Sequence, residues 1–103
     1  MQLTGFNTIL KGLLLSVLLY VAACETAPPV QEMSDARQAI AVAREAGAAE
    51  HAAFHLKAAE DYLESAQQAL NEHQYSEARR DAKQAKMKAL DALEASETSD
   101  EDD

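Results

Sequence analysis

Apolar side chains recur at helical spacing through a long stretch of the chain that contains almost no residue able to interrupt a helix. Between residues 31 and 95 there is no Pro, and Gly47 is the only Gly. Ala, Glu, Gln, Lys and Leu dominate this stretch, and all of them are strong helix formers. No segment alternates apolar and polar residues at the period of two that is typical of a strand. The sequence therefore predicts an all-α fold for residues 31–95.

Three sets of apolar residues, each spaced by three or four positions, predict three helices. The first set is Met33, Ala36, Ile40 and Ala43. The second is Ala52, Leu56, Ala59, Leu63, Ala66 and Leu70, widened by Phe54, Tyr62 and Ala69. The third is Tyr75, Ala78, Ala82, Ala85, Ala89 and Ala92, flanked by Leu90 and Leu93. Ser34 is the expected N-cap of the first helix, and Gly47 suits its C-terminal end.

The second and third sets are out of phase, so one straight helix cannot bury both of them on the same side. We expect a second helix from about Glu50 to about His73 and a turn within residues 71–76. Asn71 is the expected left-handed cap, and Ser76 is the expected N-cap of the third helix. The result is a short three-helix arrangement dominated by an antiparallel, Ala-rich hairpin, with the first helix over its remaining face. Because residues 71–76 contain neither Gly nor Pro, a single long helix remains the alternative.

Both ends of the chain differ from this helical domain. Lys11 precedes an apolar run over residues 12–23, which is shorter than the roughly 20 residues that span a bilayer. A positive charge before a short apolar run predicts a secretory signal peptide over residues 1–23. Pro28 and Pro29 favour an extended backbone and predict a tether over residues 24–30. Residues 96–103 lack apolar side chains and predict a disordered acidic tail.

The junction between the apolar run and the tether carries the only Cys of the chain. Val21-Ala22-Ala23-Cys24 resembles the lipobox of bacterial lipoprotein precursors. A lone Cys in an exported chain has no disulfide partner within that chain, which fits a modified thiol. The resemblance implies cleavage before Cys24, diacylglycerol on its thiol and a membrane anchor. By similarity to enteric lipoproteins, Glu25 favours the outer membrane over the inner one, with the domain facing the periplasm.

The helical domain also resembles known families. The segments Ala36 to Ala48 and Ala52 to Leu93 resemble a family of small bacterial envelope lipoproteins with a helical domain of unknown function. That family combines a helix of Ala-x-x-Ala spacing, ending in Ala-Gly-Ala, with a hairpin that has Tyr at its turn. Its relatives occur joined to peptidoglycan-binding domains of the outer-membrane-protein-A type, which implies a place near the cell wall but no activity. The hairpin is also similar to a partial tetratricopeptide repeat around Tyr75.

Two groups of polar residues are candidate sites. His51 and His55 are one helical turn apart and are weak candidates for a metal site, since two His are too few ligands for stable binding. A basic cluster is a candidate contact for an acidic partner or lipid, and it consists of Arg79, Arg80, Lys83, Lys86 and Lys88. The alternative is that this cluster pairs across the hairpin, with Glu64 close to Lys83 and Glu60 close to Lys86.

The composition argues against several classes of function. The formal net charge of −9 disfavours binding to nucleic acid through bulk electrostatics. The sequence contains no phosphate-binding Gly loop, no second Cys and no supported Ser/His/Asp arrangement, so we expect neither an enzyme nor a cofactor.

The leading hypothesis is a lipid-anchored, periplasm-facing helical module that binds an envelope protein or a partner associated with the cell wall. One alternative is a spacer between outer membrane and cell wall that self-associates through its Ala seams, like the major murein lipoprotein. The sequence has Asp103 where that lipoprotein has its C-terminal Lys. Another alternative is a low-affinity carrier of lipid or metal.

Overall fold

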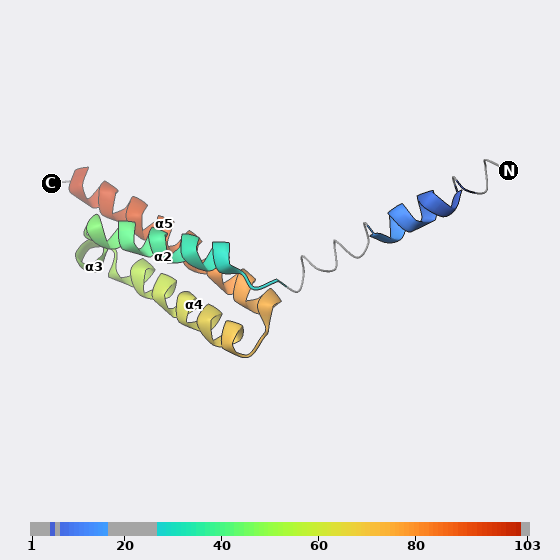
Figure 1. Cartoon of the computed structure of the whole chain (residues 1–103). Helices are drawn as coiled ribbons and strands as arrows, with labels where there is room; N and C mark the ends of the chain where they lie inside the picture. The colour runs from blue at the N-terminus through green and yellow to red at the C-terminus, as the bar shows by residue number, and fades with distance from the viewer. Residues whose placement is uncertain (1–4, 6, 17–26, 102–103) are drawn as a thin grey trace.

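The computed structural model describes residue 5, residues 7–16 and residues 27–101, and these are helical apart from short connections (Figure 1). Residues 7–16 form a helix near the N-terminus. The bundle consists of α2 (Val30–Glu45), α3 (Ala48–His51), α4 (Ala53–Asn71) and α5 (Tyr75–Glu101). The predicted all-α fold is confirmed.

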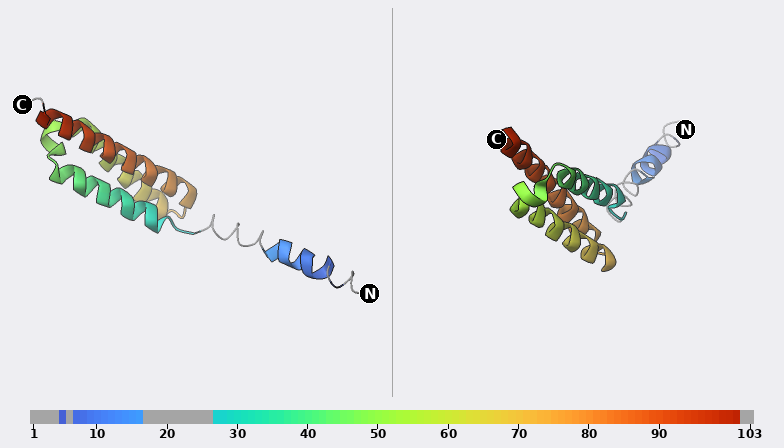
Figure 2. Two further views of the ribbon diagram at one scale, coloured as in Figure 1. Left: turned by 90° about the horizontal axis from the view of Figure 1, so that it is seen from above. Right: turned by 90° about the vertical axis from the view of Figure 1, so that its left-hand side faces the viewer.

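The longest helix, α5, is the centre of the bundle. It packs extensively against both α4 and α2, whereas α2 and α4 contact each other much less. The chain reverses direction between α4 and α5 and again between α2 and α4, so α2 and α5 run parallel (Figures 1 and 2). The predicted antiparallel hairpin is therefore confirmed as α4 and α5, and α2 covers its remaining side.

Small side chains let the three helices approach closely. All the buried apolar residues of α5 are Ala, and none of them has accessible surface: Ala78, Ala82, Ala85, Ala89 and Ala92. The larger core side chains come from α2 and α4, among them Met33, Ile40 and Leu56. Because Ala presents only a methyl group, helix axes can lie near the short end of the usual range of about 8–10 Å.

The burial pattern confirms most of the predicted seams. All four residues of the first seam are buried, as are the Ala residues of the other two. Phe54 and Tyr62 were wrongly predicted to widen the second seam, because their side chains are 84% and 36% exposed. Leu90 is 47% exposed. Phe54, Tyr62 and Leu90 lie outside the sides of α4 and α5 that pack against the other helices.

The first helix begins earlier than its capping residues predict. The prediction of Ser34 as N-cap is wrong, because α2 begins at Val30 and Pro29 occupies the cap position. The Met33 N–H donates to the Pro29 carbonyl at 3.0 Å. Pro29 is itself fully buried, so packing of its ring fixes the start of the helix. The predicted tether therefore ends before Val30.

Gly47 ends α2 as predicted. It adopts a left-handed conformation with φ of 87°, and its N–H donates to the Arg44 carbonyl at 3.0 Å. A residue without a Cβ suits this position because L side chains rarely adopt a positive φ. The predicted helix from Glu50 to His73 is instead divided at Ala52, whose φ of −145° separates α3 from α4.

A turn separates α4 from α5, which decides against the single long helix. The left-handed residue is His73, with φ of 63°, so the prediction of Asn71 is wrong. The Gln74 N–H donates to the Ala69 carbonyl and the His73 N–H donates to the Leu70 carbonyl, as in a Schellman motif. Ser76 lies inside α5 rather than at its N-cap.

The acidic end of the chain continues α5. The prediction of a disordered tail is wrong for Ser96–Glu101, which are helical, whereas residues 102–103 lie outside the described residues. Ser96 is fully buried, and its hydroxyl donates to the Ala92 carbonyl at 2.8 Å. Near the end of α5, the Ser99 hydroxyl lies 3.3 Å from the His51 Nδ1 of α3. Contact with α3 therefore supports this part of the helix.

Candidate functional site

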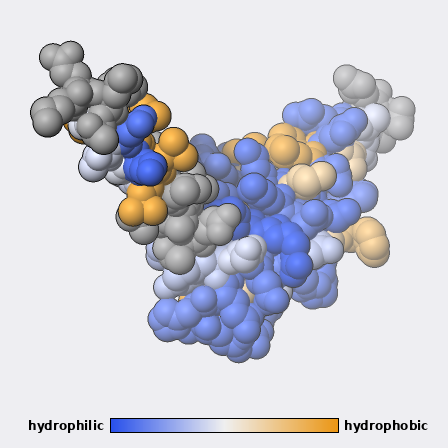
Figure 3. Space-filling view, turned by 90° about the vertical axis from the view of Figure 1, so that its right-hand side faces the viewer, coloured by the Kyte–Doolittle hydropathy of each residue, from blue (hydrophilic) through white to orange (hydrophobic). Residues whose placement is uncertain are grey.

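The described helical residues near the N-terminus are all exposed and belong to neither core cluster. Every residue from 7 to 16 is exposed, including the large apolar side chains Ile9, Leu10, Leu13, Leu14 and Leu15. Figure 3 shows apolar side chains along this segment, while the end of the bundle turned to the viewer is mostly hydrophilic. The core of the bundle is therefore closed without these residues. Of the helices that the structure describes, none combines the length and hydropathy needed to cross a bilayer.

The predicted lipidation site, Cys24, lies outside the described residues. The described chain resumes at Ala27, whose carbonyl accepts a hydrogen bond from the Arg79 guanidinium at 3.0 Å. Arg79 also pairs with Glu32 of α2, with Nε at 3.3 Å from a carboxylate oxygen. This arginine therefore fixes the entry of the chain into the bundle, next to the first turns of α2 and α5.

Four of the five predicted basic residues share one side of α5, because Arg79, Arg80 and Lys86 lie three or four positions from Lys83, whereas Lys88 lies on another side. Arg79 turns toward α2, and Arg80 pairs with the neighbouring Asp81 at 3.5 Å. Lys86 and Lys88 are two residues apart, which separates them by about 200° around the helix. Lys83 and Lys86 are exposed, and within the described part of the chain neither forms an ion pair.

The ion pairs predicted across the hairpin are not those observed. Glu60 pairs with Arg44 of α2 at 2.6 Å rather than with Lys86. The charged groups of this pair are 56% and 40% exposed, so it stabilises the fold by at most about 1 kcal/mol. The contact that does cross the hairpin is less conspicuous in the sequence. The Ser65 hydroxyl of α4 donates to the Asp81 carboxylate of α5 at 2.8 Å.

The two candidate metal ligands do not share one helix. His51 ends α3 and His55 lies in α4, so the break at Ala52 removes the one-turn geometry that the sequence predicts. His51 contacts Ser99, and His55 makes an edge-on ring contact with Phe54 at 5.7 Å between centroids. The described residues contain no group of three or more His, Cys, Asp or Glu side chains placed to hold a metal ion.

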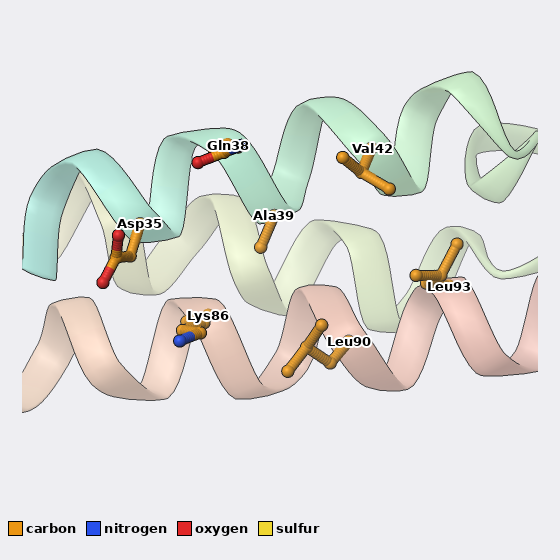
Figure 4. A pocket seen from close by; sticks show the side chains of 7 residues that line it. All are labelled: Asp35, Gln38, Ala39, Val42, Lys86, Leu90 and Leu93. Atoms are coloured by element: carbon orange, nitrogen blue, oxygen red, sulfur yellow. The ribbon is translucent and has the colours of Figure 1, made fainter.

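An open groove lies between α2 and α5. Its volume is about 260 Å³, and Asp35, Gln38, Ala39, Val42, Lys86, Leu90 and Leu93 line it (Figure 4). Val42 and Leu90 are 42% and 47% exposed. Sequence periodicity missed the groove because it forms only when α2 lies parallel to α5. Its signal was the presence of apolar residues, Val42 and Leu90, outside the buried seams.

A comparison with protein families identifies the helical domain. The family model described as "Domain of unknown function (DUF4398)" matches residues 31–103, which include all of the bundle except the first residue of α2. No curated protein and no solved structure matches the chain. The chain therefore belongs to the DUF4398 family of domains of unknown function.

Proposed function

We propose that this chain is a lipoprotein that holds a helical interaction module at the periplasmic side of a bacterial envelope membrane, with Cys24 as its anchor. The module is the bundle of α2 to α5, and it binds an envelope protein or a partner associated with the cell wall. Glu25 favours the outer membrane as the site of anchoring.

The single observation that carries the proposal is that the described apolar residues near the N-terminus, within residues 7–16, are exposed and contribute nothing to the core. A group of large exposed apolar side chains generally marks a site of interaction with another protein or with a membrane. Of residues 1–23, the described residues 7–16 are all exposed and belong to neither cluster of buried core residues. The only Cys of the chain directly follows residues 1–23.

The contacts at the N-terminal end of the bundle support a short connection to a membrane. Arg79 and the buried Pro29 fix the chain from Ala27 onward. Ala27 is three positions after Cys24, and an extended chain spans at most about 3.6 Å per residue. An acylated Cys24 would therefore hold Ala27 within about 11 Å of the anchored residue.

The charge of the chain makes a lipid anchor physically useful. With a formal net charge of −9, the chain would be repelled by anionic headgroups. Each buried methylene of an acyl chain contributes about 0.8 kcal/mol, so two or more chains on one thiol offset that repulsion many times over.

The arrangement of the core favours an interaction module over a spacer that associates through Ala seams. The five inaccessible Ala residues of α5 pack within this chain, so their surface is not available to a second copy. The surfaces that remain open include the groove between α2 and α5, a hollow between α2 and α4, and the polar outer faces.

Metabolic labelling tests the proposal. The full chain is produced in a bacterial host supplied with an alkyne fatty acid, and the membrane fraction is analysed for label. Cys24→Ser should abolish both the label and membrane retention, without changing the helical circular-dichroism signal. Cys24→Ser/Thr26→Cys retains one thiol but moves it out of the lipobox, and it should also remain unlabelled. Equal labelling of all three proteins, or no labelling of the unaltered chain, would refute the anchor.

A further inference from the structure

One exposed face of α5 has a composition unlike the rest of the bundle. Its residues are spaced by three, four or seven positions around Leu90 and therefore share one side of the helix. The face, called the Leu90 face below, consists of Lys83, Lys86, Met87, Leu90, Leu93, Glu94 and Glu97. Met87 and Leu90 are 57% and 47% exposed, the four charged side chains are exposed as well, and Leu93 is half-buried against the core.

The charges of the Leu90 face are arranged symmetrically about Leu90 with opposite sign. Two lysines lie four and seven residues before Leu90, at Lys86 and Lys83. Two glutamates lie four and seven residues after it, at Glu94 and Glu97. Within the described part of the chain, no ion pair involves any of these four residues.

Helix α2 adds an apolar border to this face. Val42 and Ala39 line the groove beside Leu90 and Leu93, as Figure 4 shows from close by. The groove is therefore an open channel with apolar walls from two parallel helices, next to the line of charges. Lys86 lies at the polar end of this channel, together with Asp35.

We propose that the occupant of this groove is a second copy of the chain, whose α5 lies antiparallel to the first with Leu90 on the two-fold axis. In that register Lys86 of each chain faces Glu94 of the other, and Lys83 faces Glu97. Met87 of each chain lies opposite Leu93, and Leu90 meets Leu90 beside Val42. A parallel pair would instead place lysines against lysines and glutamates against glutamates, which is unfavourable.

Charge is the reason to prefer a second copy over an unrelated helix. The whole chain has a formal net charge of −9, yet the Leu90 face carries two Lys and two Glu and is neutral. A surface that is complementary to itself under a two-fold rotation is what an isologous dimer requires. From Lys83 to Glu97 the face is only about 21 Å long, so we expect a dissociation constant on the order of 10–100 µM.

Disulfide trapping tests the register. The full chain with Cys24→Ser is prepared in mild detergent, and a single thiol is introduced at Leu90→Cys or at Lys83→Cys. Leu90→Cys should form a covalent dimer on mild oxidation, because the two residues meet on the axis. Lys83→Cys should not, because two copies of residue 83 lie about 21 Å apart, far beyond the Cα separation of a disulfide. Mixing Lys83→Cys with Glu97→Cys chains should restore the covalent dimer.

Charge reversal tests the complementarity without covalent chemistry. Lys83→Glu/Lys86→Glu and Glu94→Lys/Glu97→Lys should each raise the dissociation constant of the homodimer by at least about tenfold in sedimentation experiments. A mixture of the two variants should associate at least as tightly as the unaltered chain, which also shows that both remain folded.

Three results would overturn the dimer. The first is a chain that stays monomeric up to about 1 mM, which would leave the groove to a helix of another protein. The second is trapping at Lys83→Cys as efficient as at Leu90→Cys, which would indicate a parallel or random pair. The third is a mixture of charge-reversed variants that fails to associate. All of these experiments use chains that carry Cys24→Ser, so none of the results depends on acylation of Cys24.

Discussion

Replacing Ala89 by Leu puts an isobutyl group at a position of α5 that has no accessible surface. Ala89 belongs to a cluster with Ile40 and Ala43 of α2 and with Leu56 and Ala59 of α4. Helices on both sides therefore close the space that a larger side chain would need. The added carbon atoms can enter only if the helices move apart or neighbouring side chains leave their preferred rotamers.

Because Ala89 is enclosed in this way, Ala89→Leu should lower the free energy of unfolding. Overpacking of a core typically costs about 1–3 kcal/mol, and a Leu between two closely packed helices belongs at the upper end, about 3 kcal/mol. Domains are stabilised by about 0.05–0.15 kcal/mol per residue, which gives roughly 4–11 kcal/mol for residues 27–101. The substitution should therefore remove between a quarter and three quarters of the free energy of unfolding.

Urea denaturation followed by circular dichroism at helical wavelengths measures this loss. With a denaturant dependence of about 1 kcal/mol per M for a small domain, the midpoint should fall by about 3 M. Ala41→Leu is the matched control, because Ala41 is exposed on α2 and the same side chain is introduced. Its midpoint should shift by no more than about 0.5 M. Equal midpoints for the two variants would refute the core packing, since Ala89 would then have to be as accessible as Ala41.

Three further substitutions test local features of the fold by the same denaturation measurement. Gly47→Ala should cost about 1–2 kcal/mol, because φ is 87° and the new Cβ would lie 3.3 Å from His51 Cδ2; an unchanged midpoint would contradict the left-handed turn. His73→Gly should stabilise the chain by about 0.5–1 kcal/mol, because Gly relieves a positive φ of 63°; a loss of stability would argue that the ring contact with Tyr75 outweighs the strain. Ser65→Ala should cost about 1–2 kcal/mol because the buried Asp81 carboxylate loses its hydroxyl donor. A double-mutant cycle with Asp81→Ala should recover most of that cost as coupling, and additive effects would deny the contact.

The seams of the helices could be predicted from the sequence because burial in this fold follows the helical period closely. Met33 and Ile40 lie on one face of α2, and that face is the one that meets α5 and α4. The turn before α5 was likewise predicted, because the apolar residues of the second and third seams fall on different sides of one continuous helix. No Gly or Pro marks this turn. The residue that adopts the left-handed conformation could not be predicted, because it depends on where α4 ends and not on the preferences of Asn71.

The ends of the helices depend on tertiary contacts, which cannot be predicted from the neighbouring residues in the sequence. Ser34 satisfies the rules for an N-cap, but the burial of Pro29 moves the start of α2 upstream. The sequence Ser96–Glu101 has the composition of a disordered tail, yet Ser96 is buried and Ser99 contacts His51. In both places packing against a distant segment outweighs the local preference.

The residues of the candidate sites could be predicted from the sequence, but their arrangement in space could not. Four of the five basic residues of α5 share one side of the helix, but Lys88 does not, and Arg79 binds the start of the chain. The groove between α2 and α5 requires the parallel placement of two helices that α4 separates in the sequence, so the apolar residues Val42 and Leu90 alone could not place it.

The intact mass of the chain recovered from membranes of a bacterial host tests acylation of Cys24 most directly. The predicted result is a mass that lacks residues 1–23 and carries acyl groups on the new N-terminal Cys. A mass equal to that of the unmodified sequence from Met1 to Asp103 would contradict the anchor.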